Sequence, residues 1–166
     1  MCMMCEGASL DDVRFHIHGL IEGSGWAVIP VEGNTPYRSW AYTVGLVQTF
    51  EHPELVVVGL DPLAAGRLLN SIGDAIRDGA RLAAEEVILL GREHIHMAQV
   101  HACHFAAGTF AAWVDYYGAL GPPRPDPQAL ELVLPGTAPR LNRPFPVFQS
   151  PHTRKKGNSP KKRRRR

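Results

Sequence analysis

The chain has 166 residues, of which 45% are hydrophobic and 20% are charged. These values are typical of one globular domain with a core that needs no disulfide bonds, and they exclude a chain that is disordered throughout. Residues 151–166 hold nine of the 18 basic residues and none of the 16 acidic ones, so residues 1–150 carry a net charge of −7 although the whole chain carries +2. The charge therefore divides the chain into an acidic body and a basic tail.

Cysteine usage and hydropathy predict a cytoplasmic protein. Three cysteines are too few, and too odd in number, for a disulfide scaffold. The amino terminus lacks the basic start and apolar stretch of a signal peptide. No apolar run approaches the ~20 residues that a membrane span needs, so we expect no membrane partner.

The first predicted helix begins after Ser9 and runs to about Glu22. Ser9 is a suitable N-cap, and Asp12, three residues later, can return a hydrogen bond to it. Apolar residues then recur at three- and four-residue spacing, which predicts one buried face. Gly23 and Gly25 end this helix.

Residues 39–60 are predicted to form two buried strands at the centre of the fold, after an apolar extended segment at 26–31. β-Branched and aromatic residues dominate both halves, each half ends in Gly-Leu, and the insert 47–53 carries the polar and turn-forming residues. Asp61-Pro62 then begins a second helix, as N-cap and first helical residue, and Gly79 ends it.

The rest of the body predicts two strands at 86–90 and 95–101, a helix from about Phe110 to Tyr117, and a last strand at 130–134 after a proline-rich connector. We assign residues 1–134 to one domain, 135–150 to a Pro-rich extension and 151–166 to a disordered tail. The tail has almost no apolar residue to offset the entropy of ordering it.

The predicted fold is a single α+β domain with a largely antiparallel sheet of five or six strands and two or three helices, chiefly on one face. The helix that begins at Asp61-Pro62 joins two strands and allows one parallel pairing. A mixed sheet is therefore the alternative.

Several short motifs follow one another in a fixed order: Met1-Cys2-x-x-Cys5, Gly25-Trp26, Ala41-Tyr42-Thr43-Val44-Gly45-Leu46, His52-Pro53-Glu54-Leu55, Gly59-Leu60 and Leu69-Asn70. Over about residues 1–118 this series resembles a bacterial family known only as domain of unknown function 4262. The resemblance implies no activity. Members of that family tend to end with a Phe-Pro-Trp-like segment, where this chain has Phe145-Pro146-Val147 and then its basic tail.

The central strand pair carries the first candidate site. Polar side chains stand there among the most apolar residues of the chain, namely Tyr42, Thr43, His52 and Glu54, with Asn70 on the following helix. We expect them to converge on a ligand pocket in which His52 reaches Glu54 or Tyr42 directly or through one water. The favoured function is then a ligand-binding or accessory protein, whose partner is a small molecule or another protein. The alternative is that these residues only shape a turn and pack.

Zinc is the candidate cofactor of a second interpretation, a metal-dependent enzyme. Cys2 and Cys5 have the spacing that lets two thiolates hold one tetrahedral ion. His94 and His96 point to the same face of a strand and could complete the site. The alternative is a structural cysteine pair and a polar strand face.

A third interpretation is a protein that contacts nucleic acid through its tail. The tail's basic residues would neutralise phosphates without regard to sequence, most densely at Lys155, Lys156, Lys161, Lys162, Arg163, Arg164, Arg165 and Arg166. The acidic body would repel phosphate, so the tail is an appendage and not part of a nucleic-acid-binding fold.

Overall fold

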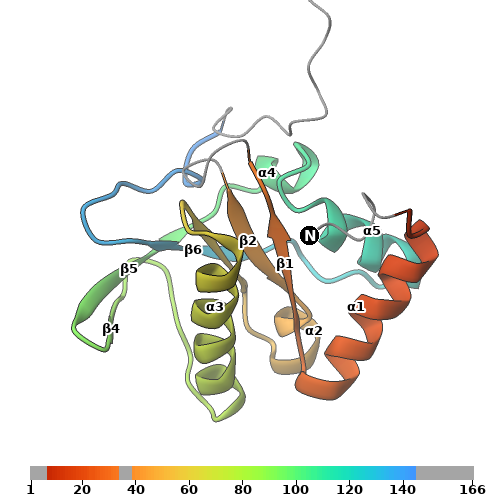
Figure 1. Ribbon diagram of the computed structural model, residues 1–166, viewed down its shortest axis with the longest axis horizontal. Coiled ribbons are helices and arrows are strands. Elements are labelled where there is room, and N and C mark those ends of the chain that lie inside the picture. The colour runs from red at the N-terminus through yellow and green to blue at the C-terminus, as the bar shows by residue number, and fades with distance from the viewer. Residues whose placement is uncertain (1–6, 34–38, 145–166) are drawn as a thin grey trace, which may run out of the picture.

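The computed structural model describes residues 7–33 and 39–144, which contain six strands. These are β1 (Ala27–Val31), β2 (Trp40–Val44), β3 (Glu54–Val58), β4 (Val87–Leu90), β5 (Glu93–Gln99) and β6 (Ala129–Val133). They form one sheet in the order β1-β2-β3-β6-β5-β4 (Figure 1). Neighbours are antiparallel except β3 and β6, which run parallel. The α+β class with five or six strands is confirmed, and the sheet is mixed because of this one pair.

Five helices accompany the sheet in the described residues: α1 (Leu10–Ser24), α2 (Leu46–Phe50), α3 (Pro62–Arg77), α4 (Cys103–Ala106) and α5 (Ala111–Leu120). The three longer ones were expected. The short helix α2 lies largely within the insert that the sequence assigned to a turn. No helix in the described part of the chain combines the length and the hydropathy needed to cross a membrane.

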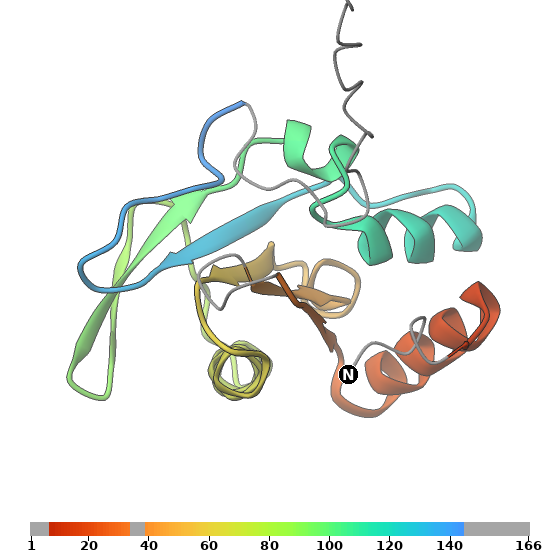
Figure 2. The ribbon, with the colours of Figure 1, turned by 45° about the horizontal axis from the view of Figure 1, so that its top comes forward.

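Both faces of the sheet are covered, although we expected the helices chiefly on one. Helix α3 packs on one face, and α1, α4 and α5 contribute to the core on the other (Figure 2). Every residue of β2, β3 and β6 is buried, so these strands have no wet face. A sheet whose central strands are apolar on both sides needs a layer on each.

The helix starts follow the local rules. The Ser9 hydroxyl accepts a hydrogen bond from the Asp12 amide at 3.2 Å, and the Asp12 carboxylate accepts one from the Ser9 amide at 2.9 Å. The Asp61 carboxylate accepts hydrogen bonds from the amides of Leu63 and Ala64. These caps satisfy amides that the first turn of each helix leaves unpaired.

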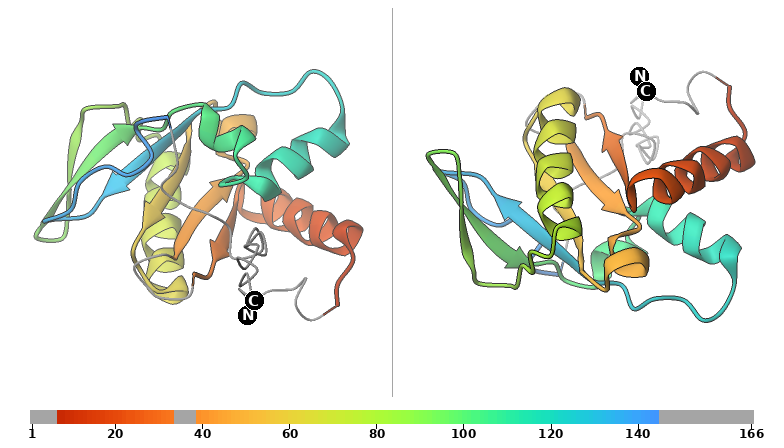
Figure 3. Two further views of the ribbon diagram at one scale, coloured as in Figure 1. Left: turned by 90° about the horizontal axis from the view of Figure 1, so that it is seen from above. Right: turned by 90° about the horizontal axis from the view of Figure 1, so that it is seen from below.

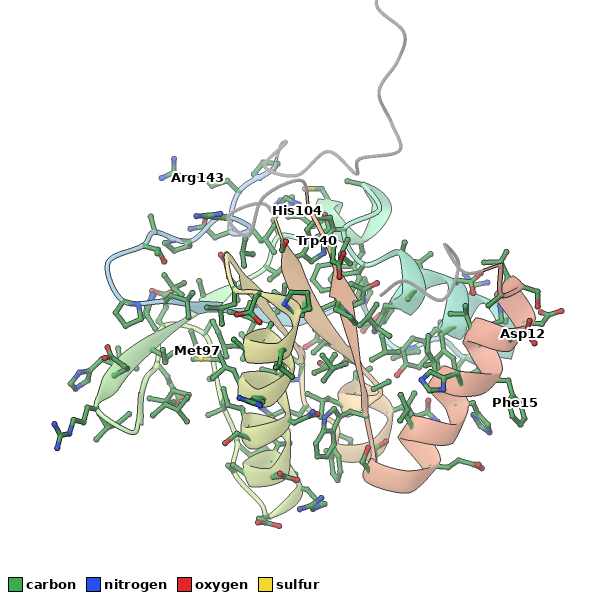
Figure 4. All side chains as sticks on the ribbon, viewed as in Figure 1. Asp12, Phe15, Trp40, Met97, His104 and Arg143 are labelled. Atoms are coloured by element: carbon green, nitrogen blue, oxygen red, sulfur yellow. The ribbon has the colours of Figure 1, made fainter. Side chains whose placement is uncertain are left out.

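Residues 135–144, the first part of the Pro-rich extension, pack against the body. The buried Glu131 carboxylate on β6 accepts hydrogen bonds from the amides of Arg140 and Leu141, and the Leu141 side chain is fully buried. The His104 ring contacts the Arg143 carbonyl at 2.9 Å between its Nε2 and the oxygen, and Figure 4 shows both residues at the same end of the molecule. Phe15, by contrast, projects into solvent from α1 in that view.

The close contact between α3 and β1 gives a matched pair of substitutions. A Cβ atom added at Gly73 would lie 2.5 Å from the ring of Trp26, whereas one at Gly66, two turns earlier, would meet nothing within 4 Å. Alanine is favoured over glycine in a helix by roughly 0.5–1 kcal/mol. We therefore expect Gly66→Ala to raise the free energy of unfolding by about that amount, and Gly73→Ala to lower it by about 1–3 kcal/mol through overpacking.

Urea denaturation of both variants measures the difference. Equal stabilisation by the two substitutions would contradict the observed packing of Trp26 on Gly73.

Candidate functional site

The Glu54 carboxylate is the centre of a polar corner where β2 turns into α2. It is fully buried and accepts four hydrogen bonds, from the Thr43 hydroxyl at 2.6 Å and from the amides of Gly45 at 2.9 Å, Leu46 at 3.3 Å and Val47 at 3.4 Å. The Thr43 hydroxyl oxygen in turn accepts a hydrogen bond from the Leu55 amide at 2.8 Å. One carboxylate thus joins the end of β2, the start of α2 and the start of β3.

The backbone at Gly45 makes this geometry feasible. Gly45 has φ = 116°, a left-handed conformation that favours glycine, and a Cβ there would lie 2.9 Å from the Gly25 carbonyl oxygen. As the N-cap residue of α2 it also has no side chain to accept from the first amides of the helix. Glu54, which follows the helix in sequence, provides the missing acceptor.

Burial and hydrogen bonding act in opposite directions on Glu54. Burial is the larger effect and raises the pKa of its carboxyl group above the usual value, although the hydrogen bonds from Thr43 and from the three amides act to lower it. All four partners donate, which matches the ionised carboxylate. The four lone-pair sites of the group are occupied, so it acts as an anchor and not as a proton carrier.

Tyr117 of α5 lies beside this corner. Its side chain is 3% exposed, and its hydroxyl proton finds no acceptor among the described residues, although the amides of Gly45 and Gln48 lie close enough to act on its oxygen. Burial is the main cause that raises the pKa of the phenol, and the nearby charges of Glu54 and Tyr116 raise it further, whereas the amides of Gly45 and Gln48 oppose them. The phenol is therefore neutral at physiological pH and keeps a proton that it can donate.

An open hollow of about 430 Å³ lies next to Tyr117. In both views of Figure 3 the segment that leads from α5 to β6 passes beside α2. The hollow is lined by Gln48 of α2, Tyr117 and Leu120 of α5, and Gly121, Pro123, Arg124 and Pro125 of that segment. Gln48 belongs to the central stretch that the sequence singled out, whereas Tyr117 and Arg124 were missed. Tyr117 carries no local signal that distinguishes it from its neighbour Tyr116.

His52 lies in a different environment from Glu54. Its Nε2 accepts a hydrogen bond from the Leu82 amide at 3.1 Å, so its proton is on Nδ1, which donates to the Pro53 carbonyl at 2.7 Å. Burial is the largest cause that lowers the pKa of this imidazole, and Arg81 lowers it further, while the Pro53 carbonyl acts in the other direction. The expected direct contact of His52 with Glu54 or Tyr42 is not formed, because both ring nitrogens have backbone partners.

Tyr42 and Asn70 also lie apart from the corner. The Tyr42 hydroxyl accepts a hydrogen bond from the Ala112 amide at 3.0 Å, and its ring packs edge-on against Phe110. Asn70 accepts one from the Trp26 indole nitrogen at 2.9 Å. Of the five predicted ligand-binding residues, the structure brings only Thr43 and Glu54 into contact. The five side chains therefore do not converge on a single pocket, and that prediction is corrected. Contacts with residues far away in the sequence turn Tyr42, His52 and Asn70 toward other partners.

The predicted zinc ligands are described only in part. His94 and His96 lie on β5, where His96 is 3.6 Å from the Glu85 carboxylate. Within residues 7–33 and 39–144 no group of three or more His, Cys, Asp and Glu side chains is close enough to hold a metal ion. Cys2 and Cys5 lie outside the described residues, as does the basic tail with Lys155, Lys156, Lys161, Lys162 and Arg163 to Arg166. Zinc binding and nucleic-acid contact therefore stay predictions.

The fold and its polar corner define a small α+β domain with a six-stranded mixed sheet and a buried carboxylate at its centre. A family model described as "Domain of unknown function (DUF4262)" matches residues 20–141, and the chain belongs to this family. The match includes β6 and the buried Leu141, beyond the motifs seen in the sequence, and begins after the cysteine pair. Searches of curated proteins and of solved structures found no match.

The contacts of His52 predict a structural role with a defined pH dependence. Replacing His52 by alanine leaves the Leu82 amide without its acceptor and opens a cavity, so we expect a loss of about 2–4 kcal/mol in the free energy of unfolding. The pKa of His52 is lowered in the folded state, so the stability it contributes is present above the unfolded pKa of about 6.5 and is lost as the pH falls through the folded value.

Urea denaturation between pH 5 and 8 should show the gap between wild type and His52→Ala widening with pH. The exposed His16 provides the control substitution, His16→Ala. A gap that narrows as pH rises would mean that the folded protein holds His52 protonated.

Proposed function

We propose that this protein binds a small molecule in the hollow between α2 and the segment that follows α5. The observation that carries the proposal is Tyr117, whose side chain lines the hollow and whose hydroxyl proton has no acceptor among the described residues. Buried polar groups are paired in the great majority of cases. Because the oxygen has no exposed surface, a ligand in the hollow reaches this hydroxyl when the ring turns outward.

The composition of the wall supports this proposal. The Tyr117 ring, Leu120, Pro123 and Pro125 supply apolar surface, and Gln48 and Arg124 supply polar groups. Small-molecule sites commonly combine mostly apolar walls with a few polar groups that orient the ligand. Leu120 is 54% exposed, so this surface is accessible from solvent.

Binding is favoured over acid–base catalysis by the state of Glu54. The Glu54 carboxylate, whose charge acts on the Tyr117 phenol, is fully buried, and its four donors leave it no lone pair with which to take a proton from a ligand. Its role in the proposal is to fix the start of α2, and hence Gln48, relative to Tyr117.

Removing a single hydroxyl group tests the proposal. Tyr117→Phe keeps the ring and loses only the unpaired hydroxyl, so the stability should change by less than about 1 kcal/mol. Benzamide, a neutral aromatic amide, serves as the probe, and its binding should weaken by about tenfold in the variant if one hydrogen bond of about 1.4 kcal/mol is lost.

Backbone amide shifts in ¹H–¹⁵N NMR titrations measure the affinity and locate the probe. The control is Tyr116→Phe, which removes the contact of that hydroxyl with His18 at 3.0 Å and leaves the hollow unchanged. The proposal fails if benzamide shifts none of the amides of Gln48, Tyr117, Leu120 and Gly121, or if both variants bind it equally.

A further inference from the structure

The charges around the hollow carry an inference about the ligand. Arg124 is the one charged residue among those that line it. Its guanidinium makes one long hydrogen bond, from Nη2 to the Gly118 carbonyl at 3.4 Å, and forms no salt bridge with another described residue. Most of its donors are therefore free for an anionic partner.

No described carboxylate forms a salt bridge with Arg124, including that of Asp126 two residues away. Glu54 is buried and is occupied by four donors. Asp115, on α5, is held by Arg14 through both oxygens, at 2.8 and 2.7 Å. The hollow therefore has a net positive lining on a body whose residues 1–150 carry −7 overall, and a cationic ligand would meet repulsion there.

Resting on the proposed function, we infer that the ligand is a small aromatic carboxylate. The planar guanidinium of Arg124 matches a carboxylate by two parallel hydrogen bonds. The Tyr117 ring, Leu120 and the prolines form the surface on which an apolar ring would pack. The Gln48 amide is left for a polar substituent on that ring.

A carboxylate fits this lining better than a phosphate. Phosphate sites in proteins commonly collect several donors, from backbone amides at a helix start or from more than one basic side chain. Here the amides of Gly45, Leu46 and Val47 at the start of α2 are taken by Glu54, and the lining holds a single basic residue. One guanidinium beside an apolar wall suits a monoanion.

The test compares benzoate with benzamide and phenyl phosphate, three probes that share a ring and differ in charge, by ¹H–¹⁵N NMR titration of the full chain. Benzoate should bind about tenfold more tightly than benzamide, and phenyl phosphate no more tightly than benzoate. Arg124→Gln should reduce benzoate affinity to the level of benzamide and leave benzamide within twofold. Arg92→Gln, which removes an exposed arginine from the β4–β5 turn, should change neither.

Each other outcome has a definite meaning. Equal binding of benzoate and benzamide at the hollow would overturn the inference that the ligand is a carboxylate, but it would support the proposal that the hollow binds a small molecule. Tighter binding of phenyl phosphate would overturn it in favour of a phosphorylated ligand. If Arg92→Gln weakened benzoate binding as much as Arg124→Gln does, the preference for benzoate would come from the net charge of the protein and not from Arg124. That result would also overturn the inference of a carboxylate ligand. If no probe shifts the hollow, both this inference and the proposed function fail.

Discussion

The fold depends on how a buried negative charge is held where β2 ends. Glu54 has no contact with water, so its carboxylate loses the hydration that normally stabilises it. The Thr43 hydroxyl and the three amides that begin α2 replace that hydration with fixed dipoles. Removing these partners would leave an unpaired buried charge, and removing the carboxylate would leave unpaired buried amides. Each side of the arrangement therefore requires the other.

This corner accounts for several of the sequence motifs by which the chain resembles the family. Gly45 must be glycine because the backbone is left-handed and the Gly25 carbonyl is in the way, and Thr43 links Glu54 to the Leu55 amide. Trp26 packs on Gly73 and donates to Asn70 on α3. In the sequence, the polar residues of these motifs resemble a catalytic set. In the structure, most of their hydrogen bonds are made to other groups of the protein. Tyr117 and Arg124, which line the hollow, lie outside the motifs.

Local signals predicted much of the fold. Ser9 and Asp61 cap two helices through hydrogen bonds to residues only two or three positions away, so both helix starts are visible in the sequence. The apolar residues of 39–60 likewise indicate that this stretch is buried. Helix α2 was not predictable in this way, because the acceptor for its first amides is Glu54, which comes after the helix in sequence. The parallel pairing of β3 with β6 could not be decided from the sequence for a similar reason, since it joins residues that are 75 positions apart, such as Glu54 and Ala129.

The candidate site was less predictable than the fold. His52 and Glu54 are two residues apart and suggest a base with its orienting carboxylate, yet His52 turns to the Leu82 amide and Glu54 to α2. Which way each side chain points is decided by backbone groups that lie up to 30 residues away. The hollow itself is made by a helix end and a proline-rich segment that carry no motif.

Native-state amide hydrogen exchange tests the role of Glu54 most directly. Glu54→Gln preserves the shape of the side chain but turns an amide donor toward amides that need an acceptor. Protection at Gly45, Leu46 and Val47 should fall sharply in this variant, and fall less at the β1–β2 ladder, while Glu51→Gln, at an exposed neighbouring glutamate, should change neither. Unchanged protection at those three amides in Glu54→Gln would contradict the claim that the buried carboxylate holds the start of α2.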